Sequence, residues 1–404
     1  MTDIPTFDTI KLDSADNVAT ITLNRPDRLN SMPPAMADDI REALDHLPCL
    51  GARALLITGE GRGFCSGADL AGDRSAGGAV SGRARSRNAL RGHYNPMLLA
   101  LANLDIPVVV AVNGPAAGVG CSFALSGDFT IAGKSAYFLQ AFVNIGLVPD
   151  GGSSWLLPRL VGVPRALQMM MLGEKISADQ AADWGMIYKS VEDADLLTEA
   201  KALATRLANG PTIALGTMRK VLRDGLTQDF ATTLDAEAKG QFIAGGTADA
   251  MEGIMAFQQK KMEEEQAEMV READENLAEG AAYRATHAEK EGVTVTESGL
   301  QYEVLASGEG ASPAATDTVV AHYHGTLIDG TVFDSSVDRG EPATFPLDRV
   351  IEGWQEALPM MKIGDKWRIV LPPHLAYGDQ GAGGVIGPNA TLVFEVELID
   401  IVKE

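Results

Sequence analysis

Short apolar runs alternate with amphipathic segments through the first part of the chain. Residues 17–24 (NVATITLN), 52–59 (ARALLITG) and 107–114 (PVVVAVNG) are rich in β-branched and other apolar side chains and predict strands. Residues 36–47 and 163–173 carry apolar side chains at helical spacing and predict helices. Strands and helices in alternation predict an α/β fold with a largely parallel sheet.

One long stretch, residues 106–127, contains no charged residue. It is long enough to suggest a membrane span, but Pro107, Asn113, Pro115 and four glycines interrupt it. We therefore expect a buried strand, a loop and a buried helix in this stretch.

The pattern changes near residue 260. Residues 260–292 are dense in Glu and Ala, which predicts a long amphipathic helix or, as the alternative, a solvated charged linker. The residues that would form a narrow apolar stripe along this helix are Met262, Met269, Ala273, Leu277 and Ala281.

Short strands and turns are predicted from about residue 293 to residue 404. Asp329-Gly330 between two alternating runs is typical of a hairpin turn. The runs that predict strands are 300–305, 317–333, 365–372 and 391–402. The pattern thus divides the chain into a domain over 1–260, a helical connector over 261–292 and a mainly β domain over 293–404.

Charge and cysteine content narrow the class of protein. The 404 residues include 33 basic and 55 acidic ones, and the net charge of −22 argues against general affinity for nucleic acid or an anionic membrane. Cys49, Cys65 and Cys121 show no CxxC spacing, which disfavours a disulfide framework or a zinc site. The first residues carry acids where a secretory signal carries lysines. These features together predict a cytoplasmic protein.

Two glycine-rich loops follow predicted strands, at residues 59–70 and 113–124. Such loops direct backbone N–H groups at one point, which suits a phosphate or a developing oxyanion. Neither loop matches the P-loop or the full dinucleotide-binding pattern. GCSFA within the second loop is similar to a nucleophile elbow, but Ala124 replaces the last glycine and no histidine is placed by spacing, so a serine hydrolase is disfavoured.

Five separated motifs resemble the enoyl-CoA hydratase/isomerase (crotonase) family over about residues 5–260. They are LNRPDRLNSM, GEGRGFCSGADL, VNGPAAGVGCSFALSGD, GLVPDGGSSWLLPRLVG and ADWGMIYKSV, in this order. The resemblance implies an α/β crotonase domain (a ββα spiral), an acyl-CoA thioester as substrate and assembly into trimers or dimers of trimers.

The same resemblance assigns site residues. The amides of Ala68 and Val119 would form an oxyanion hole for the thioester carbonyl. Arg25 and Arg28 would contact the CoA phosphates, and the loop from Ala68 to Leu70 would receive the adenine end. Solvated surface arginines are the alternative for Arg25 and Arg28.

The family's hydratases use two glutamates to add water to a double bond. Those positions align with Ser122 and Phe142, so both acids are missing here, and Phe142 is assigned to the substrate pocket instead. Asp150 is the remaining candidate acid or base, and one carboxylate suffices to move a proton along an acyl chain. GLVPDGGSSW resembles the subgroup of 1,2-epoxyphenylacetyl-CoA isomerases and 3-enoyl-CoA isomerases, in which an aspartate at this place is the acid/base.

The residues around Asp150 predict either a carboxyl with a raised pKa or a helix cap. Flanking Leu147, Val148 and Trp155 predict partial desolvation of the carboxylate and hence a raised pKa. The alternative is that Asp150 merely caps the helix that begins at the following glycines.

Four motifs over about residues 293–404 resemble an FKBP-type peptidyl-prolyl isomerase of the macrophage infectivity potentiator branch, whose helical segment often dimerises. They are YEVLASGEG, VAHYHGTLIDGTVFDSS, RVIEGWQEAL and LAYGDQGAGGVIGPNATLVFEVEL. The resemblance implies an α+β domain, with an antiparallel sheet and a short helix, that acts on proline-containing polypeptides. The residues that would line its pocket are Tyr323, Phe333, Asp334, Val350, Ile351, Trp354, Tyr377, Ile386 and Phe394.

Within this pocket the Tyr377 hydroxyl and the Ile351 amide would bind peptide carbonyls, Trp354 would form the floor, and Tyr377 and Asp334 are assigned to catalysis. The chain departs from the family pattern where Ala343 replaces an aromatic residue, and where Ala382 and Gly387 stand in place of histidine and proline. His322 and His324 alternate on one strand, but without a third ligand they do not predict a metal site.

The sequence thus predicts a fusion of an acyl-CoA isomerase with a prolyl isomerase. The alternatives are an enoyl-CoA hydratase, or a chaperone-like prolyl isomerase that uses an inactive crotonase domain as an oligomeric scaffold. We expect a homo-oligomer, a trimer or a hexamer, with no metal and no cofactor beyond the coenzyme A of the substrate.

Overall fold

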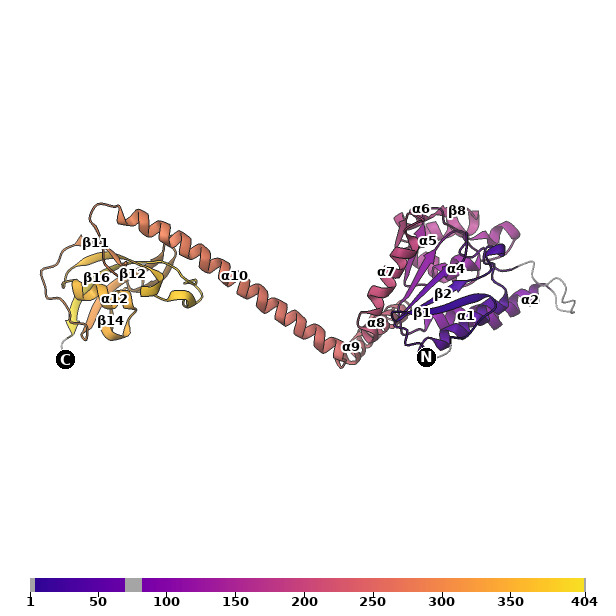
Figure 1. Cartoon of the computed structure of the whole chain (residues 1–404), viewed down its shortest axis with the longest axis horizontal. Helices are drawn as coiled ribbons and strands as arrows, with labels where there is room; N and C mark the ends of the chain where they lie inside the picture. The colour runs from indigo at the N-terminus through magenta and orange to yellow at the C-terminus, as the bar shows by residue number, and fades with distance from the viewer. Residues whose placement is uncertain (1–3, 70–81, 403–404) are drawn as a thin grey trace. The chain divides into compact units, whose positions relative to one another are not determined.

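The computed structural model describes residues 4–69 and 82–402 and divides the chain into two compact units, Met1–Ile254 and Met255–Glu404 (Figure 1). Leu70, predicted to contact the adenine end of CoA, lies outside the described residues. In the described part of the chain, no helix combines the length and the apolar character needed to cross a membrane.

The first unit is built on a six-stranded sheet that is parallel except at one edge. The order is β1-β2-β3-β4-β6-β9, and only β1 runs antiparallel to its neighbour. The strands are β1 (Ile10–Ala15), β2 (Val18–Leu23), β3 (Ala54–Gly59), β4 (Val108–Val112), β6 (Phe129–Gly133) and β9 (Lys189–Val191). The predicted strands over 17–24, 52–59 and 107–114 are confirmed as β2, β3 and β4.

Both faces of this sheet are covered, which explains why its central strands are apolar at every position. In β3, Leu55 and Ile57 belong to one core, whereas Ala54 and Leu56 belong to the core under α7 (Leu196–Ala208). The first core also includes residues of α1 (Pro34–His46) and α3 (Asn95–Ala102). Figure 1 shows α1 and α7 on opposite sides of the strands.

The remaining elements of the unit surround the ends of the sheet. A second small sheet has the order β5-β7-β8. These elements are η1 (Pro26–Arg28), α2 (Gly82–Ala89), η2 (Leu90–Tyr94), β5 (Ala116–Ala117), α4 (Val119–Ala124), β7 (Tyr137–Leu139), η3 (Ala141–Ile145), α5 (Ser153–Leu167), η4 (Gln168–Leu172), β8 (Lys175–Ser177) and α6 (Ala178–Asp183). The uncharged stretch 106–127 is confirmed as a buried strand, β4, a loop and a buried helix, α4.

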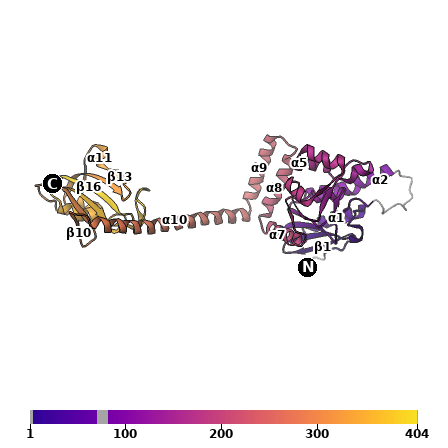
Figure 2. The same ribbon diagram turned by 90° about the horizontal axis from the view of Figure 1, so that it is seen from above.

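Two further helices, α8 (Thr212–Gly225) and α9 (Phe230–Gly245), lie side by side (Figure 2). They leave large apolar side chains in solvent: Leu222 is 72% exposed, Phe230 78% and Phe242 86%. Apolar groups at this density on one helical pair are uncommon on the surface of a monomer.

The predicted long helix is confirmed as α10 (Ala248–Ala288). Its last turns pack on the C-terminal domain through a polar and small-residue face. Asn276 Nδ2 donates to the Pro388 carbonyl at 2.9 Å, and Gly280 lies so close to Thr391 that a Cβ there would be 2.3 Å from its Oγ1. The buried His287 pairs with Gln301 at 2.9 Å. The apolar stripe lies elsewhere on the helix: Met262, Met269 and Leu277 are 61%, 58% and 48% exposed.

The C-terminal domain is an antiparallel sheet that encloses one core with α12 (Glu352–Ala357), as the fold class predicts (Figure 1). The strand order is β10-β11-β15-β16-β12-β13, and β14 also pairs with β12. Its elements are β10 (Val293–Val295), β11 (Gln301–Ala306), β12 (Thr318–Leu327), β13 (Val332–Ser335), α11 (Ser336–Arg339), β14 (Ala343–Pro346), η5 (Leu347–Arg349), η6 (Leu358–Met360), β15 (Lys366–Leu371), η7 (Pro373–Leu375), η8 (Gly378–Gln380) and β16 (Leu392–Val402). The predicted hairpin at Asp329-Gly330 joins β12 to β13.

Candidate functional sites

The two glycine-rich loops meet because they leave neighbouring parallel strands. One follows β3 and the other follows β4, so both start at the carboxyl edge of the sheet, where ligands of open α/β sheets bind. Cys65 forms a parallel bridge with Ala116, and a Cβ on Gly118 would be 3.8 Å from the Gly67 Cα. The loops are therefore in direct contact.

Each loop contains one of the two residues whose amides the family resemblance predicts as oxyanion donors. Ala68 forms a parallel bridge with Met32. The Met32 amide donates to the Gly67 carbonyl, and the Met32 carbonyl accepts from the Asp69 amide. In a parallel bridge of this kind the N–H of the residue between them, Ala68, points away from Met32. Val119 is the first residue of α4, where a helical N–H has no partner within the helix. Phe142 is 8% exposed, and a Cβ on Gly118 would be 3.7 Å from its Cζ atom, so its ring lies beside the second loop.

Asp150 precedes α5, on the chain segment that packs against α4. A Cβ on Gly151 would be 3.3 Å from Val119 Cγ2. The turn that carries the Asp150 carboxyl therefore lies against Val119, whose amide is the second predicted oxyanion donor. The Oδ1 atom of Asp150 is buried and has no hydrogen-bond partner among the described residues. Burial raises the pKa of Asp150 from 3.8 to about 6.

The surroundings of Asp150 bear on its predicted raised pKa and on the alternative that it caps a helix. The raised pKa agrees with the prediction, but Leu147 and Val148 are 53% and 81% exposed and contribute little of the burial. The helix-capping alternative is wrong, because the N-cap of α5 is Gly152 and no side chain caps it. Only the backbone carbonyl of Asp150 accepts from the Ser153 amide, at 3.2 Å.

Tyr94 is a site residue that the sequence did not single out. It ends the π-helical turn η2, is 4% exposed, and donates from its hydroxyl to the Met32 carbonyl at 2.7 Å. The same carbonyl accepts from the Asp69 amide, so Tyr94 supports the loop that carries Ala68. Burial and, to a lesser extent, the nearby Asp150 charge raise the pKa of Tyr94. The sequence signal for this residue is the stretch HYNP at 93–96, which is similar to the 1,2-epoxyphenylacetyl-CoA and 3-enoyl-CoA isomerase subgroup.

The two arginines predicted to bind CoA phosphates have different environments. Arg25 forms an ion pair with Asp69 at 2.9 Å and donates to the Ser31 carbonyl at 2.6 Å, so it holds the loop. These contacts give Arg25 a structural role in the loop, and its contact with a CoA phosphate stays a prediction. Arg28 is exposed at the end of η1, and Ser66 of the first loop donates to its carbonyl at 3.3 Å, which leaves its side chain near the loop for an anion.

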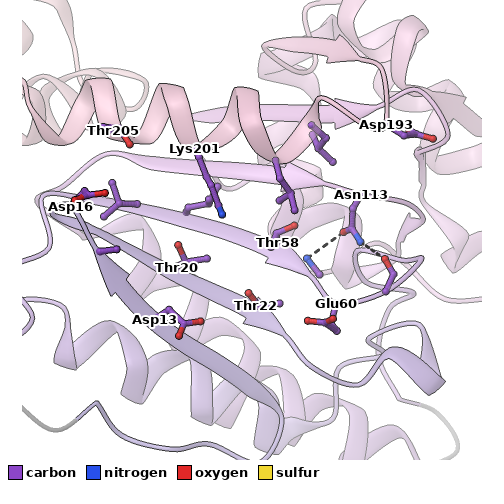
Figure 3. Close-up of a pocket in the computed structure, with 17 residues that line it drawn as sticks. Asp13, Asp16, Thr20, Thr22, Thr58, Glu60, Asn113, Asp193, Lys201 and Thr205 are labelled. Carbon is purple, nitrogen blue, oxygen red and sulfur yellow. Dashed lines mark hydrogen bonds between the residues drawn. The ribbon is translucent and has the colours of Figure 1, made fainter.

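A groove on another part of the first domain is a separate feature. It has a volume of about 640 Å³ and lies between the outer strands and α7, where Lys201 faces Thr20, Thr22 and Thr58 (Figure 3). Its other charged side chains are acidic: Asp13, Asp16, Glu60 and Asp193. The residues assigned to the acyl-CoA site do not line it, and its acidic walls are unsuited to CoA phosphates.

The predicted aromatic pocket of the C-terminal domain is assembled around Trp354. Trp354 is 5% exposed, and its ring meets those of Tyr323 and Phe394 edge-on, with centroids 5.3 and 5.2 Å apart. Phe333 packs edge-on against Phe394 at 5.3 Å. Ile386 is 9% exposed, and Val350 and Ile351 pack against the same core.

Phe345 and Arg339 also belong to this site, although neither was predicted from the sequence. The Phe345 ring lies 5.2 Å from that of Trp354, so an aromatic side chain two residues after Ala343 is present in the pocket. Tyr323 donates to Asp334 Oδ2 at 2.5 Å, and Arg339 pairs with Asp334 and donates to the Tyr323 hydroxyl at 2.8 Å. Hydrogen bonds from Tyr323 and Arg339 outweigh the opposing effect of burial and lower the pKa of Asp334, which keeps it ionised.

The environments of Tyr377 and Ile351, predicted to bind peptide carbonyls, differ. Tyr377 is 40% exposed, and its hydroxyl has no partner among the described residues. Ile351 is the N-cap residue of α12. His322 and His324 instead pair with Ser336 and Ser335, at 3.1 and 2.9 Å, and the described residues contain no cluster of three side chains able to hold a metal ion.

An oxyanion-type pair of amides beside a desolvated carboxyl is typical of acyl-CoA enzymes, and an aromatic pocket of this kind is typical of prolyl isomerases. The family described as "Enoyl-CoA hydratase/isomerase" matches residues 13–266, and the family described as "FKBP-type peptidyl-prolyl cis-trans isomerase" matches residues 309–399. The chain therefore belongs to the enoyl-CoA hydratase/isomerase family and carries an FKBP-type peptidyl-prolyl isomerase domain at its C-terminal side.

Individual relatives agree with both assignments. The chain is 44% identical over 246 residues to the 1,2-epoxyphenylacetyl-CoA isomerase of Escherichia coli, covering 60% of this chain and 93% of that protein. It is 42% identical over 255 residues to a probable enoyl-CoA hydratase of Rhodobacter capsulatus, covering 63% and 96%. It is 51% identical over 168 residues to the FKBP-type 22 kDa peptidyl-prolyl cis-trans isomerase of E. coli, covering 39% and 82%.

A solved structure supports the fold of the first domain. The crystal structure of an enoyl-CoA hydratase/isomerase homologue from Mycobacterium abscessus superposes with a TM-score of 0.58 and 35% sequence identity, covering 62% of this chain and 96% of that one. The crotonase fold predicted for the first domain is thereby confirmed.

The raised pKa of Asp150 makes a prediction about stability. A carboxyl whose pKa is higher in the folded than in the unfolded state favours folding at low pH, and this contribution is lost as the pH rises through about 6. Asp150→Asn should therefore be more stable than the native chain at pH 8, by about 1–2 kcal/mol after allowance for partial exposure, and the difference should shrink toward pH 5. Urea unfolding at both pH values measures it.

Asp229 provides the matched control for this measurement. It caps α9 by accepting from the Thr232 amide at 2.9 Å, and these hydrogen bonds lower its pKa. The stability that the Asp229 carboxylate gives to the folded chain is lost only at acidic pH, as the pH falls through that lowered pKa. Asp229→Ala should therefore lower the free energy of unfolding equally at pH 5 and pH 8. A stability difference for Asp150→Asn that does not change between the two pH values would contradict the assignment.

Proposed function

We propose that the first domain isomerises an acyl-CoA thioester by proton transfer through Asp150. The observation that carries the proposal is a desolvated carboxyl, with a pKa of about 6, on a turn that contacts Val119. A pKa near the working pH lets one group both accept and return a proton. The likeness to an epoxyphenylacetyl-CoA isomerase supports this assignment, and an epoxide or a 3-enoyl substrate both suit it.

In this mechanism the acyl carbonyl lies against the amides of Ala68 and Val119. The Asp150 carboxylate removes a proton from C2 of a 3-enoyl thioester, and the electron pair moves onto the thioester oxygen as a dienolate. Each amide aimed at that oxygen stabilises the transition state by about 3–4 kcal/mol. Asp150 then delivers the proton to C4, which yields the 2-enoyl thioester and regenerates the carboxylate.

Hydration is the competing reaction, because an enoyl-CoA hydratase homologue is also close. A hydratase needs groups that hold and split a water molecule. Ser122 and Phe142, at the positions of the hydratase acids, are 0% and 8% exposed and carry no carboxyl group. Isomerisation is favoured for this reason.

Replacement of the proposed base should abolish the reaction. Asp150→Asn keeps the size of the side chain but cannot accept the proton, so we expect kcat for a short-chain 3-enoyl-CoA to fall at least about 10³-fold. The appearance of 2-enoyl-CoA is followed spectrophotometrically, and binding of a saturated acyl-CoA should be unchanged. Full turnover in the variant, or hydration of a 2-enoyl-CoA as the faster native reaction, would sink the proposal.

For the prolyl isomerase domain we propose that substrate carbonyls bind to the Tyr377 hydroxyl and the Ile351 amide above the Trp354 floor. Rotation about an X-Pro bond must overcome about 18–20 kcal/mol of lost amide resonance. A dry aromatic pocket that binds the twisted amide better than the planar one lowers this barrier without covalent chemistry. Asp334, held ionised by Tyr323 and Arg339, supplies the polar rim of that pocket.

Loss of the Tyr377 hydroxyl tests this arrangement. Because one neutral hydrogen bond contributes about 0.5–1.5 kcal/mol, Tyr377→Phe should lower kcat/KM for a proline-containing tetrapeptide about 2- to 10-fold. Tyr302→Phe is the matched control, since Tyr302 stacks on Trp367 and is not among the pocket residues. Equal rates for Tyr377→Phe and the native chain would refute the role of the hydroxyl.

We also propose that the chain self-associates as a trimer or hexamer through α8 and α9. The exposed Leu222, Phe230 and Phe242 support this, because burying them against a second copy removes apolar surface from water. Light scattering should give three or six chain masses for the native protein. Phe242→Glu should lower the mass, whereas Lys239→Glu, at an exposed position of the same helix, should not. A monomeric native chain would disprove the assembly.

The same exposed surface favours a second candidate function, a chaperone-like prolyl isomerase on an oligomeric scaffold. Several FKBP domains on one assembly would bind an unfolded client with greater avidity. Protection of an aggregating client should then be lost in Phe242→Glu, while turnover of a tetrapeptide stays unchanged. Retained protection in that variant would show that the oligomeric scaffold is not needed, and absence of protection by the native chain would refute this candidate function.

For location we propose the cytoplasm, supported by three cysteines without CxxC spacing. Burial raises the pKa of Cys65 and Cys121 to about 12, which keeps both thiols protonated and unreactive. A Legionella longbeachae relative, 46% identical over 158 residues, is named "Outer membrane protein MIP". Cell fractionation distinguishes the two compartments.

A further inference from the structure

Three polar side chains are completely buried beside the turn that carries Asp150. Ser122 of α4, Ser153 of α5 and Gln140, just before η3, are each 0% exposed. Buried polar groups cost stability unless they are hydrogen-bonded, so their arrangement requires an explanation.

Their hydrogen bonds form a chain with one direction. Ser122 Oγ has one hydrogen to donate, and it lies nearer to the Asp150 carbonyl, at 2.9 Å, than to the Gly118 carbonyl, at 3.4 Å. When Ser122 donates to Asp150, the contact of 2.6 Å between Ser122 Oγ and Ser153 Oγ is donated by Ser153. Gln140 Nε2 in turn donates to Ser153 Oγ at 2.9 Å. The chain therefore runs from Gln140 through Ser153 and Ser122 to the backbone of Asp150.

The backbone at the end of this chain is tightly constrained. Gly151 has φ +61°, and a Cβ there would be 2.7 Å from Ser122 Cβ, so the turn lies directly on Ser122. The Asp150 carbonyl accepts two hydrogen bonds, from Ser122 Oγ and from the Ser153 amide. The side chain of Asp150, by contrast, has a buried oxygen without a partner and is not held directly.

We propose that Ser122 is a positioning residue: by fixing the Asp150 carbonyl, it orients the carboxyl toward the acyl chain. This inference rests on the proposed isomerase function. It gives Ser122 a task of its own at the position where the resemblance places a hydratase acid. It also implies that Ser122→Glu does not create a hydratase, because the larger side chain displaces the turn that carries Asp150.

The test uses the full chain and a 3-enoyl-CoA thioester. A base displaced by about 1 Å costs on the order of 10²-fold in rate, so Ser122→Ala should lower kcat about 10- to 100-fold with KM changed less than about 3-fold. Ser153→Ala, which keeps the Ser122 hydroxyl but removes its donor, should cost less. Ser122→Ala/Ser153→Ala should be no slower than Ser122→Ala, since both residues act through one chain.

Ser126→Ala is the matched control, because Ser126 donates to the Ser122 carbonyl at 2.8 Å and not to Asp150. It should keep kcat within about 2-fold, as expected of a substitution outside the chain. Native kcat in Ser122→Ala, or an equal loss in Ser126→Ala, overturns the proposal. If Ser122→Ala does not fold, native kcat in Ser153→Ala overturns it instead.

A second measurement separates this inference from the proposed function. The stability gained at pH 8 on Asp150→Asn is measured again in the Ser122→Ala background, where a released turn lets water reach the carboxyl. A smaller gain there supports positioning by Ser122 even if the chain does not isomerise a 3-enoyl-CoA. An unchanged gain overturns the positioning role whatever reaction the domain performs.

Discussion

The first site is built around a half-buried carboxyl group, Asp150, one oxygen of which is buried and has no hydrogen-bond partner among the described residues. Desolvation favours the protonated form of this carboxyl and raises its pKa to about 6, at a cost to the stability of the folded chain near neutral pH. Such a group stays in place only if its surroundings are stable without it. The double coverage of the sheet and the contact between the two glycine-rich loops supply that stability.

In the prolyl isomerase site the pKa of the carboxyl group is lowered instead of raised. Its acidic residue, Asp334, is kept ionised by Tyr323 and Arg339, and the neutral surface beside it is aromatic. No proton has to move during rotation of an amide, so the polar groups there only need to bind. One chain thus contains a carboxyl whose pKa is raised by burial, Asp150, and another whose pKa is lowered by hydrogen bonds, Asp334.

Most of the fold and the location of both sites could be predicted from the sequence, because the signals are local. The apolar runs of β3 and β4 and the glycines that follow them are contiguous, and their meeting point follows from parallel pairing. The roles of Arg25, Tyr94 and Arg339 could not be predicted in this way. Each depends on a partner brought close only by the fold, as in the pairing of Arg25 with Asp69, 44 residues away.

The contacts of the long helix α10 could not be predicted from its sequence pattern either. Its apolar residues at helical spacing predicted an amphipathic helix, but hydrogen bonds and close contacts with the C-terminal domain come from Asn276, Gly280 and His287. A glycine permits close approach and a buried histidine needs a partner, and neither property registers in a hydrophobic pattern. The apolar stripe through Met262, Met269 and Leu277 is then left in solvent. Since tertiary packing supplies most of the stability of a helix in a protein, a helix of 41 residues with a largely exposed middle depends on charge pairs such as Lys260–Glu264 and on its docked end.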